Sequence, residues 1–265
     1  MDNYYKFDIC IVVPCIYGNL NKEAIDYWVK YHEKIGINTF YVYCFDDDKR
    51  IIDYIKNHDK LKTPDNIIKY NNQDKYNCGQ ADAVKKGYEL AKKNNHEFAF
   101  FIDMDEFIYI PKLYDNISEI LIKYINLDHI SIGNINYSIK KGIPKDWNIN
   151  ETFPLERCWF RKKLPQSHMP QNYNEFKGYC PSYRGKRKII INFINRKKNN
   201  SKDFIPSMPH NMDNTTIQNF ANINELRINE YRCLNVYPTD KIGIETEDTN
   251  FDILDPFLNN YLNFN

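Results

Sequence analysis

The segment Phe98-Ala-Phe-Phe-Ile-Asp-Met-Asp-Glu-Phe107 joins an apolar run to a group of carboxylates. A short apolar run of this kind, here Phe98 to Ile102, is typical of a strand buried on both faces of a sheet. Asp103, Asp105 and Glu106 follow it directly, so we expect them at the carboxyl end of a central strand. Open α/β sheets bind their ligands beyond that end of the strands. The segment therefore predicts both a buried sheet and the position of a functional site.

Strands and helices are expected to alternate on both sides of this segment. Apolar runs rich in β-branched and aromatic residues indicate the strands, and amphipathic stretches indicate the helices. Up to residue 102 the expected order is strand 8–14, helix 21–35, strand 39–45, helix 49–57, strand 66–70, helix 79–94 and strand 98–102. Further on we expect a helix at 117–125, strands at 129–135 and 187–194, and irregular loops over 140–185. This alternation builds βαβ units, so we predict an α/β fold with a mostly parallel sheet and helices on both faces.

The composition excludes several classes of protein. The 265 residues include 36 Lys and Arg against 35 Asp and Glu, and a net charge of +1 gives no field to attract nucleic acid. No apolar run reaches the length of about 18 residues that a membrane span needs. The N-terminal residues show no basic region followed by an apolar segment, so we do not expect them to act as a secretory signal. The seven cysteines are scattered without a CxxC pair, which argues against a zinc module or a disulfide framework.

From these properties we expect a single domain without a membrane span or a nucleic-acid partner, located in the cytoplasm. The abundance of Asn, Ile, Lys and Tyr is typical of an AT-rich genome. It favours a protist or a large DNA virus as the source, and for a virus the cytoplasm would be that of the host.

Asp103 and Asp105 form the first candidate site. Two aspartates separated by one residue can both face one divalent cation, and such a cation can neutralise a diphosphate leaving group. A buried carboxylate pair is costly without a cation, which favours a metal site over a capping or solvated acidic turn. For Glu106 we expect a structural role in holding the loop. We expect a structural role also for His32, on the apolar stripe of the helix at 21–35.

Three motifs together resemble glycosyltransferase family 92 and its relatives in the GT-A superfamily. They are Asn21-Lys-Glu-Ala-Ile-Asp-Tyr-Trp-Val-Lys-Tyr-His-Glu-Lys-Ile-Gly36, Phe40-Tyr-Val-Tyr43 and Phe101-Ile-Asp-Met-Asp-Glu-Phe107. Fainter similarity follows at 185–190, 209–210 and 228–232, so the resemblance covers about residues 9–240. The chain departs from the family pattern at Lys22, between Asn21 and Glu23, and at Glu230, where a histidine is usual.

The resemblance implies a GT-A, Rossmann-like fold in a single domain of residues 1–265. It would contain a nucleotide-binding half at 1–110, an irregular acceptor-side half at 111–240 and a C-terminal tail at 241–265. The implied reaction moves galactose or another hexose from a UDP-sugar to a hydroxyl of a glycan or glycoprotein, with inversion and with Mn²⁺ or Mg²⁺. Asp103 and Asp105 match the metal motif. His210 is the best match for a third ligand, since imidazole also suits Mn²⁺.

Residues at two strand ends are candidates for binding the nucleoside and the diphosphate. Pro14 and Tyr17, where the first strand ends, offer backbone groups and an aromatic face. Asp46 and Asp48, in the acidic run after the second strand, can accept hydrogen bonds from uracil or ribose, and the sequence does not decide between them. Asp103 is expected to contact the diphosphate as well as the metal.

Basic residues are candidates for binding the phosphates. Lys75 and Gln80 lie at a helix start whose amides and dipole suit an anion, although a plain helix start fits the sequence equally well. Lys186 shares one face of a strand with Arg184 and Lys188, since alternate residues of a strand point the same way. These side chains either reach the diphosphate or form a solvated basic edge.

An inverting transfer needs a carboxylate base that takes the proton of the acceptor hydroxyl. Glu156 follows an irregular loop and lies at an expected helix start, in the region where inverting GT-A enzymes keep their base. Glu175 and Asp213 are the alternatives. A helix-terminal ion pair of Glu156 with Arg157 or Arg161 is the competing structural interpretation.

Two other functions fit part of the sequence. A nucleotidyltransferase of the same fold would also place carboxylates and a metal beside a nucleotide, but it needs a glycine-rich phosphate loop near the N-terminus. Tyr17-Gly18-Asn19 offers a single glycine there. A non-catalytic sugar-binding or structural protein would not need Asp103 and Asp105, whereas Glu230 in place of a histidine is compatible with it.

Overall fold

The computed structural model describes residues 5–16, 22–44, 49–63, 78–138, 160–161, 188–201, 206, 221–222, 225–231 and 253–254. In chain order the elements are β1 (Ile9–Ile16), α1 (Lys22–Lys34), β2 (Thr39–Cys44), α2 (Lys49–Asn57), β3 (Leu61–Lys62), α3 (Cys78–Lys93), β4 (Phe98–Phe101), β5 (Glu106–Tyr109), α4 (Ser118–Leu121), the 3-10 helix η1 (Ile122–Tyr124), β6 (His129–Ser138), β7 (Phe160–Arg161), β8 (Lys188–Asn192), α6 (Phe193–Asn199), β9 (Arg227–Tyr231) and β10 (Ile253–Leu254). None of the helices in these ranges is long and apolar enough to cross a membrane.

The strands β1 to β4 form a parallel sheet in the order β3-β2-β1-β4. Cys10 of β1 lies opposite Thr39 of β2 on one side and Ala99 of β4 on the other. A strand with a neighbour on each side and helices over both faces needs apolar residues at every position, which explains the unbroken apolar run of β1. This arrangement confirms the predicted α/β class and its parallel sheet.

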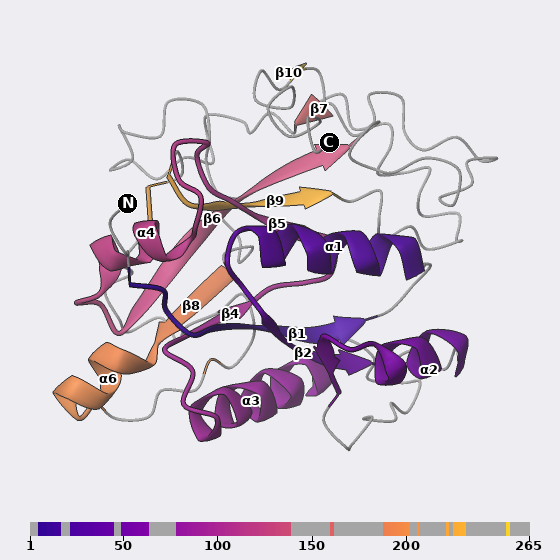
Figure 1. The fold of residues 1–265 in the computed structure, drawn as a ribbon, viewed down its shortest axis with the longest axis horizontal. Helices are drawn as coiled ribbons and strands as arrows, with labels where there is room; N and C mark the ends of the chain where they lie inside the picture. Colours follow the sequence, from indigo (N-terminus) through magenta and orange to yellow (C-terminus); the bar gives the residue numbers. More distant parts are fainter. Residues whose placement is uncertain are drawn as a thin grey trace.

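Antiparallel strands continue the sheet beyond β4. Strand β8 pairs with β4, and β6 pairs with β8, both in antiparallel register. Strand β9 runs parallel to β6 and antiparallel to β5. The segment that follows Asp105 is therefore joined to strands from the second half of the chain, as Figure 1 shows for β5, β9 and β6.

Helices cover both faces of the parallel strands (Figure 1). Ile9, Ile11 and Val13 of β1 belong to the core that contains α1 and α2. Cys10 and Val12 belong to the core beneath α3. Because side chains alternate across a strand, one apolar run serves both cores and fixes the three-layer arrangement.

Strand β8 and helix α6 differ from the prediction. The strand expected at 187–194 ends at Asn192, because the Asn192 side-chain oxygen accepts a hydrogen bond from the Asn195 amide at 3.1 Å and caps α6. Arg196 of α6 is buried, and its Nε donates to the Asp128 carbonyl at 3.1 Å. The strand expected at 66–70 lies outside the described residues.

Gly87 allows α3 to approach β1 closely. A Cβ atom at this position would lie 2.3 Å from Val12 Cγ1. We expect Gly87→Ala to lower the free energy of unfolding by about 1–2 kcal/mol, because overpacking a stiff β-branched side chain outweighs the gain in helix propensity of about 1 kcal/mol. Urea unfolding measures the loss. Adding Val12→Ala should recover part of it, and a wild-type stability of Gly87→Ala would contradict this explanation.

Candidate functional site

The acidic turn, residues 103–106, lies at the carboxyl end of β4. Strand β1 has β2 on one side and β4 on the other, so the strand order reverses at β1. The Ile102 N–H donates to the Val12 carbonyl at 3.2 Å, which places the turn beside the end of β1. Open α/β sheets bind their ligands in the crevice outside such a switch point. The structure thus places Asp103 and Asp105 at the edge that the sequence predicts, while their role as metal ligands stays a prediction.

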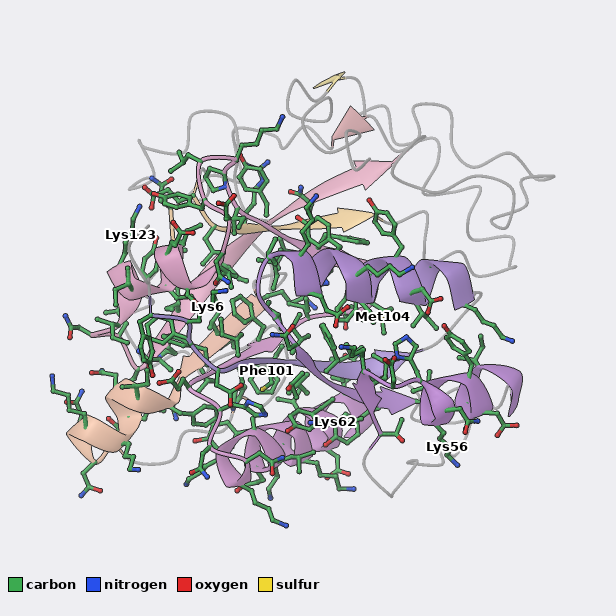
Figure 2. The ribbon with its side chains drawn as sticks, in the orientation of Figure 1. Lys6, Lys56, Lys62, Phe101, Met104 and Lys123 are labelled. Atoms are coloured by element: carbon green, nitrogen blue, oxygen red, sulfur yellow. The ribbon has the colours of Figure 1, made fainter. Side chains whose placement is uncertain are left out.

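Hydrogen bonds and one lysine shape the acidic turn. Glu106 Oε2 accepts the Asp103 N–H at 2.8 Å, and the Glu106 N–H donates to the Asp103 carbonyl at 3.1 Å. Lys188 Nζ lies 2.5 Å from Asp103 Oδ2 and 2.9 Å from Glu106 Oε2. Met104 is buried in the core that α1 covers, and Figure 2 shows it below that helix. Glu106 therefore holds the loop, as the sequence predicts.

Lys188 is a buried cation at the centre of this turn. Its side chain is 0% exposed, against 16% for Asp103 and 2% for Glu106. Burial of the ammonium lowers its pKa, but the charges of the two carboxylates and their hydrogen bonds outweigh burial, so the pKa of Lys188 is raised above its ordinary value. Lys188 is therefore charged at neutral pH.

The interpretation of the basic strand as a solvated edge is wrong for Lys188. This residue begins β8, and three isoleucines follow it in a strand that is buried throughout. The sequence signal for the burial of Lys188 is the apolar run that follows it, because this run forms a strand between β4 and β6. A buried lysine needs a carboxylate partner. The acidic turn at the end of the neighbouring strand supplies two.

Helix α1 fixes the strand that follows the turn. Trp28 Nε1 donates to the Glu106 carbonyl at 2.7 Å, and the Tyr31 hydroxyl donates to the Ile108 carbonyl at 2.8 Å. His32 Nε2 accepts the Ile108 N–H at 3.3 Å, while Nδ1 lies 2.8 Å from the Trp28 carbonyl. Because Nε2 accepts, the proton lies on Nδ1 and the imidazole is neutral. His32 has the structural role that the sequence predicts, and α1 contributes directly to the position of β5.

Burial of His32 should make the protein less stable in acid. Desolvation lowers the pKa of His32 from 6.5 to about 3. Between these two pH values the unfolded chain binds a proton that the folded chain excludes. The free energy of unfolding therefore decreases as the pH is lowered, by about 1.4 kcal/mol for each pH unit below 6.5. We expect His32→Gln to lose less stability than the wild type between about pH 7.5 and about pH 5.5, measured by urea unfolding. Equal losses would assign the titration to another group.

Two of the other predicted nucleotide ligands lie among the described residues. Pro14 is buried near the carboxyl end of β1, next to the switch point, and Gln80 is partly exposed in the first turn of α3. The predicted site residues outside the described ranges are Tyr17, Asp46, Asp48, Lys75, Glu156, Lys186 and His210.

The donor chemistry of the acidic turn fits a hard divalent cation, since carboxylate oxygens are ligands of Mg²⁺ and Mn²⁺. One oxygen of Asp103 already contacts Lys188. Within the described ranges, no group of three His, Cys, Asp or Glu side chains is arranged to hold a metal. A cation held by Asp103 and Asp105 would take its other ligands from water, from phosphate oxygens or from the rest of the chain, where the resemblance implies His210.

Comparisons with known proteins show distant likenesses in structure. No protein-family model matches the sequence, and no curated protein sequence matches it. Similar solved structures include HddC from Yersinia pseudotuberculosis complexed with GMP-PN, at 11% identity and a TM-score of 0.41, covering 91% of this chain and 97% of that one. A CMP:2-keto-3-deoxy-manno-octonic acid synthetase complexed with CTP has 11% identity and a TM-score of 0.33, covering 75% and 79%. A 4-diphosphocytidyl-2C-methyl-D-erythritol synthase from Anaerococcus prevotii has 10% identity and a TM-score of 0.36, covering 91% and 94%. At these scores the likeness does not identify a reaction for this chain.

Proposed function

We propose that this protein is a transferase that binds a nucleotide at the carboxyl edge of its parallel strands. The observation that carries the proposal is the position of the acidic turn at the β1–β4 switch point, beside the end of β1. The turn is formed by backbone and side-chain hydrogen bonds within the protein, so it exists before any ligand arrives. A preformed polar turn at this edge is suited to positioning phosphate groups.

Within this class we propose glycosyl transfer, on the strength of the sequence resemblance. Asp103 and Asp105, with His210, would hold Mn²⁺ or Mg²⁺, which neutralises the charge that develops on a UDP leaving group. Pro14, on the other side of the switch point, would border the nucleoside. Glu156 would take the proton of the acceptor hydroxyl on a glycan or glycoprotein. The transferred group would be galactose or another hexose.

Nucleotidyl transfer is the second candidate. It would use the same carboxylates and cation to align a nucleoside triphosphate. Among the described side chains of the site, Asp103, Asp105, Glu106 and Lys188 are charged groups that suit phosphate and metal, and none of them would select a sugar as the transferred group. The acidic turn therefore suits both reactions, and the products decide between them.

Nucleotide binding is expected to raise the thermal midpoint. A ligand at about a hundred times its dissociation constant adds about 2.7 kcal/mol, which raises the midpoint of a domain of this size by about 5–10 °C. We expect one of UDP, GDP, CDP, dTDP and ADP to give this shift, and a larger one with Mn²⁺. The measurement is thermal unfolding with each nucleotide, with Mn²⁺ and with EDTA. No shift with any of them would contradict the proposed function and favour the hypothesis of a non-catalytic protein.

Product analysis then separates the two reactions. A glycosyltransferase releases the nucleoside diphosphate from a nucleotide sugar when an acceptor is present. A nucleotidyltransferase instead transfers the nucleotide of a nucleoside triphosphate to a sugar phosphate and releases pyrophosphate from the triphosphate. Release of pyrophosphate alone would replace our main proposal by the second candidate.

A further inference from the structure

The ion pair of Lys188 is an unusual feature of the acidic turn. The ammonium lies within hydrogen-bond distance of Asp103 Oδ2 and Glu106 Oε2, and its side chain is fully buried. Glu106 Oε2 also accepts the Asp103 N–H, so the first and last residues of the turn contact each other as well as Lys188. A lysine is buried in this way only with carboxylate partners, because desolvation of an isolated ammonium costs several kcal/mol.

The lysine changes the charge that an incoming phosphate meets. Asp103, Asp105 and Glu106 carry a formal charge of −3, and Lys188 reduces the sum for these four side chains to −2. A nucleoside diphosphate is itself an anion, so each negative charge at the strand edge opposes its approach. At this depth in the protein such repulsion is stronger than in water, because the effective dielectric constant is lower. Lys188 is fixed in place, whereas a divalent cation has to be bound from solution.

We infer that Lys188 is a built-in counter-cation, a positioning residue that holds Asp103 and Glu106 and weakens the repulsion between the acidic turn and the phosphates of a nucleotide. The inference rests on the proposed function and deepens it, since it assigns the group that lets an acidic turn accept the phosphates of a nucleotide. Lys188 acts through the two carboxylates and does not touch the nucleotide.

The test compares the affinities for UDP and uridine, measured by calorimetry in EDTA and in saturating Mn²⁺. If UDP gives no thermal shift, the nucleotide that does, with its nucleoside, takes its place. The wild type should bind UDP in EDTA. Lys188→Met should weaken UDP binding in EDTA by about 10-fold, and by about threefold or less with Mn²⁺, because the metal supplies the missing charge. Uridine affinity should not change, because uridine has no phosphate.

A double variant separates charge from packing. Lys188→Met combined with Glu106→Gln returns the formal charge of the four side chains to −2, so we expect it to recover most of the UDP affinity in EDTA. The double variant also keeps the test valid if Lys188→Met alone does not fold. Lys123→Met is the matched control, because it removes the same charge from an exposed ion pair with Glu225 at 3.1 Å. It should leave UDP affinity unchanged.

Three results would overturn the inference. Equal losses of UDP and uridine affinity in Lys188→Met would show a purely structural role. A double variant as weak as Lys188→Met, or weaker, would show that charge balance is not the cause. Binding of UDP by the wild type only with Mn²⁺ would show that Lys188 does not offset the repulsion of the phosphates, but it would leave the proposed function intact. If no nucleotide binds under any condition, the proposed function fails together with this inference.

Discussion

Replacing Asp105 by Asn is expected to reduce transfer by about 100- to 1000-fold while the protein remains folded. Asp105 is buried in the acidic turn beside the switch point, two residues after the Lys188-bound Asp103. In the proposed reaction it would hold the divalent cation that neutralises the negative charge developing on the leaving group. Loss of one such preorganised group commonly reduces turnover by this amount. Asn keeps the size of the side chain, so the packing of the turn should change little.

The measurement is release of the leaving group from the active donor at saturating Mn²⁺, with thermal unfolding as the test of folding. Asp115→Asn serves as the matched control, because Asp115 is exposed in the segment between β5 and α4. It should retain wild-type turnover. Turnover of Asp105→Asn above about a tenth of the wild-type rate would remove Asp105 from the metal site.

The elements that the sequence predicts well are those whose signals are local. The helix expected at 49–57 has these bounds in the structure, and the helix expected at 79–94 forms as Cys78–Lys93. Both follow from the spacing of apolar residues, which is a property of each segment alone. The strand ending in the acidic turn is equally local, because five apolar residues followed by carboxylates need no partner to be recognised.

The elements that the sequence missed depend on distant partners. Strands β5 and β9 pair with each other, although more than a hundred residues separate Phe107 from its partner Asn229. Each of the two strands is short, at 4 and 5 residues, so neither carries much pattern by itself. Helix α6 was missed because Asn192 ends the preceding strand with a side-chain cap, inside a run that reads as a continuous strand.

The candidate site shows the same division. The position of Asp103 and Asp105 at a strand end could be predicted, because the strand and the carboxylates are neighbours in sequence. The Lys188 ion pair could not be predicted, since it joins residues that are 85 positions apart in the sequence. They are brought together because β4 and β8 pair in antiparallel register. The same holds for Trp28 and Tyr31, whose apolar parts fit the helix pattern while their polar atoms bind the backbone of β5.

Removal of the Lys188 charge should be among the most destabilising single changes in the protein. Lys188→Met leaves Asp103 and Glu106 without the ammonium that both contact, and breaking a buried ion pair in this way typically costs about 3–5 kcal/mol. For a chain of this size the thermal midpoint should fall by about 10 °C. The measurement is urea unfolding without ligand, so that it is independent of the proposed function.

The exposed ion pair of Lys123 is the matched control for the buried ion pair of Lys188. Its ammonium lies 3.1 Å from Glu225 and 3.0 Å from the Tyr114 hydroxyl, a similar set of contacts at the surface. Because water solvates both charges once the pair is broken, Lys123→Met should cost less than about 1 kcal/mol. Similar losses for the two variants would mean that burial does not set the energy of the Lys188 pair. A larger loss at Lys188, largely recovered when Glu106→Gln is added, would show that the uncompensated carboxylate is the cause, because the second change removes that charge and adds no contact to the lysine position.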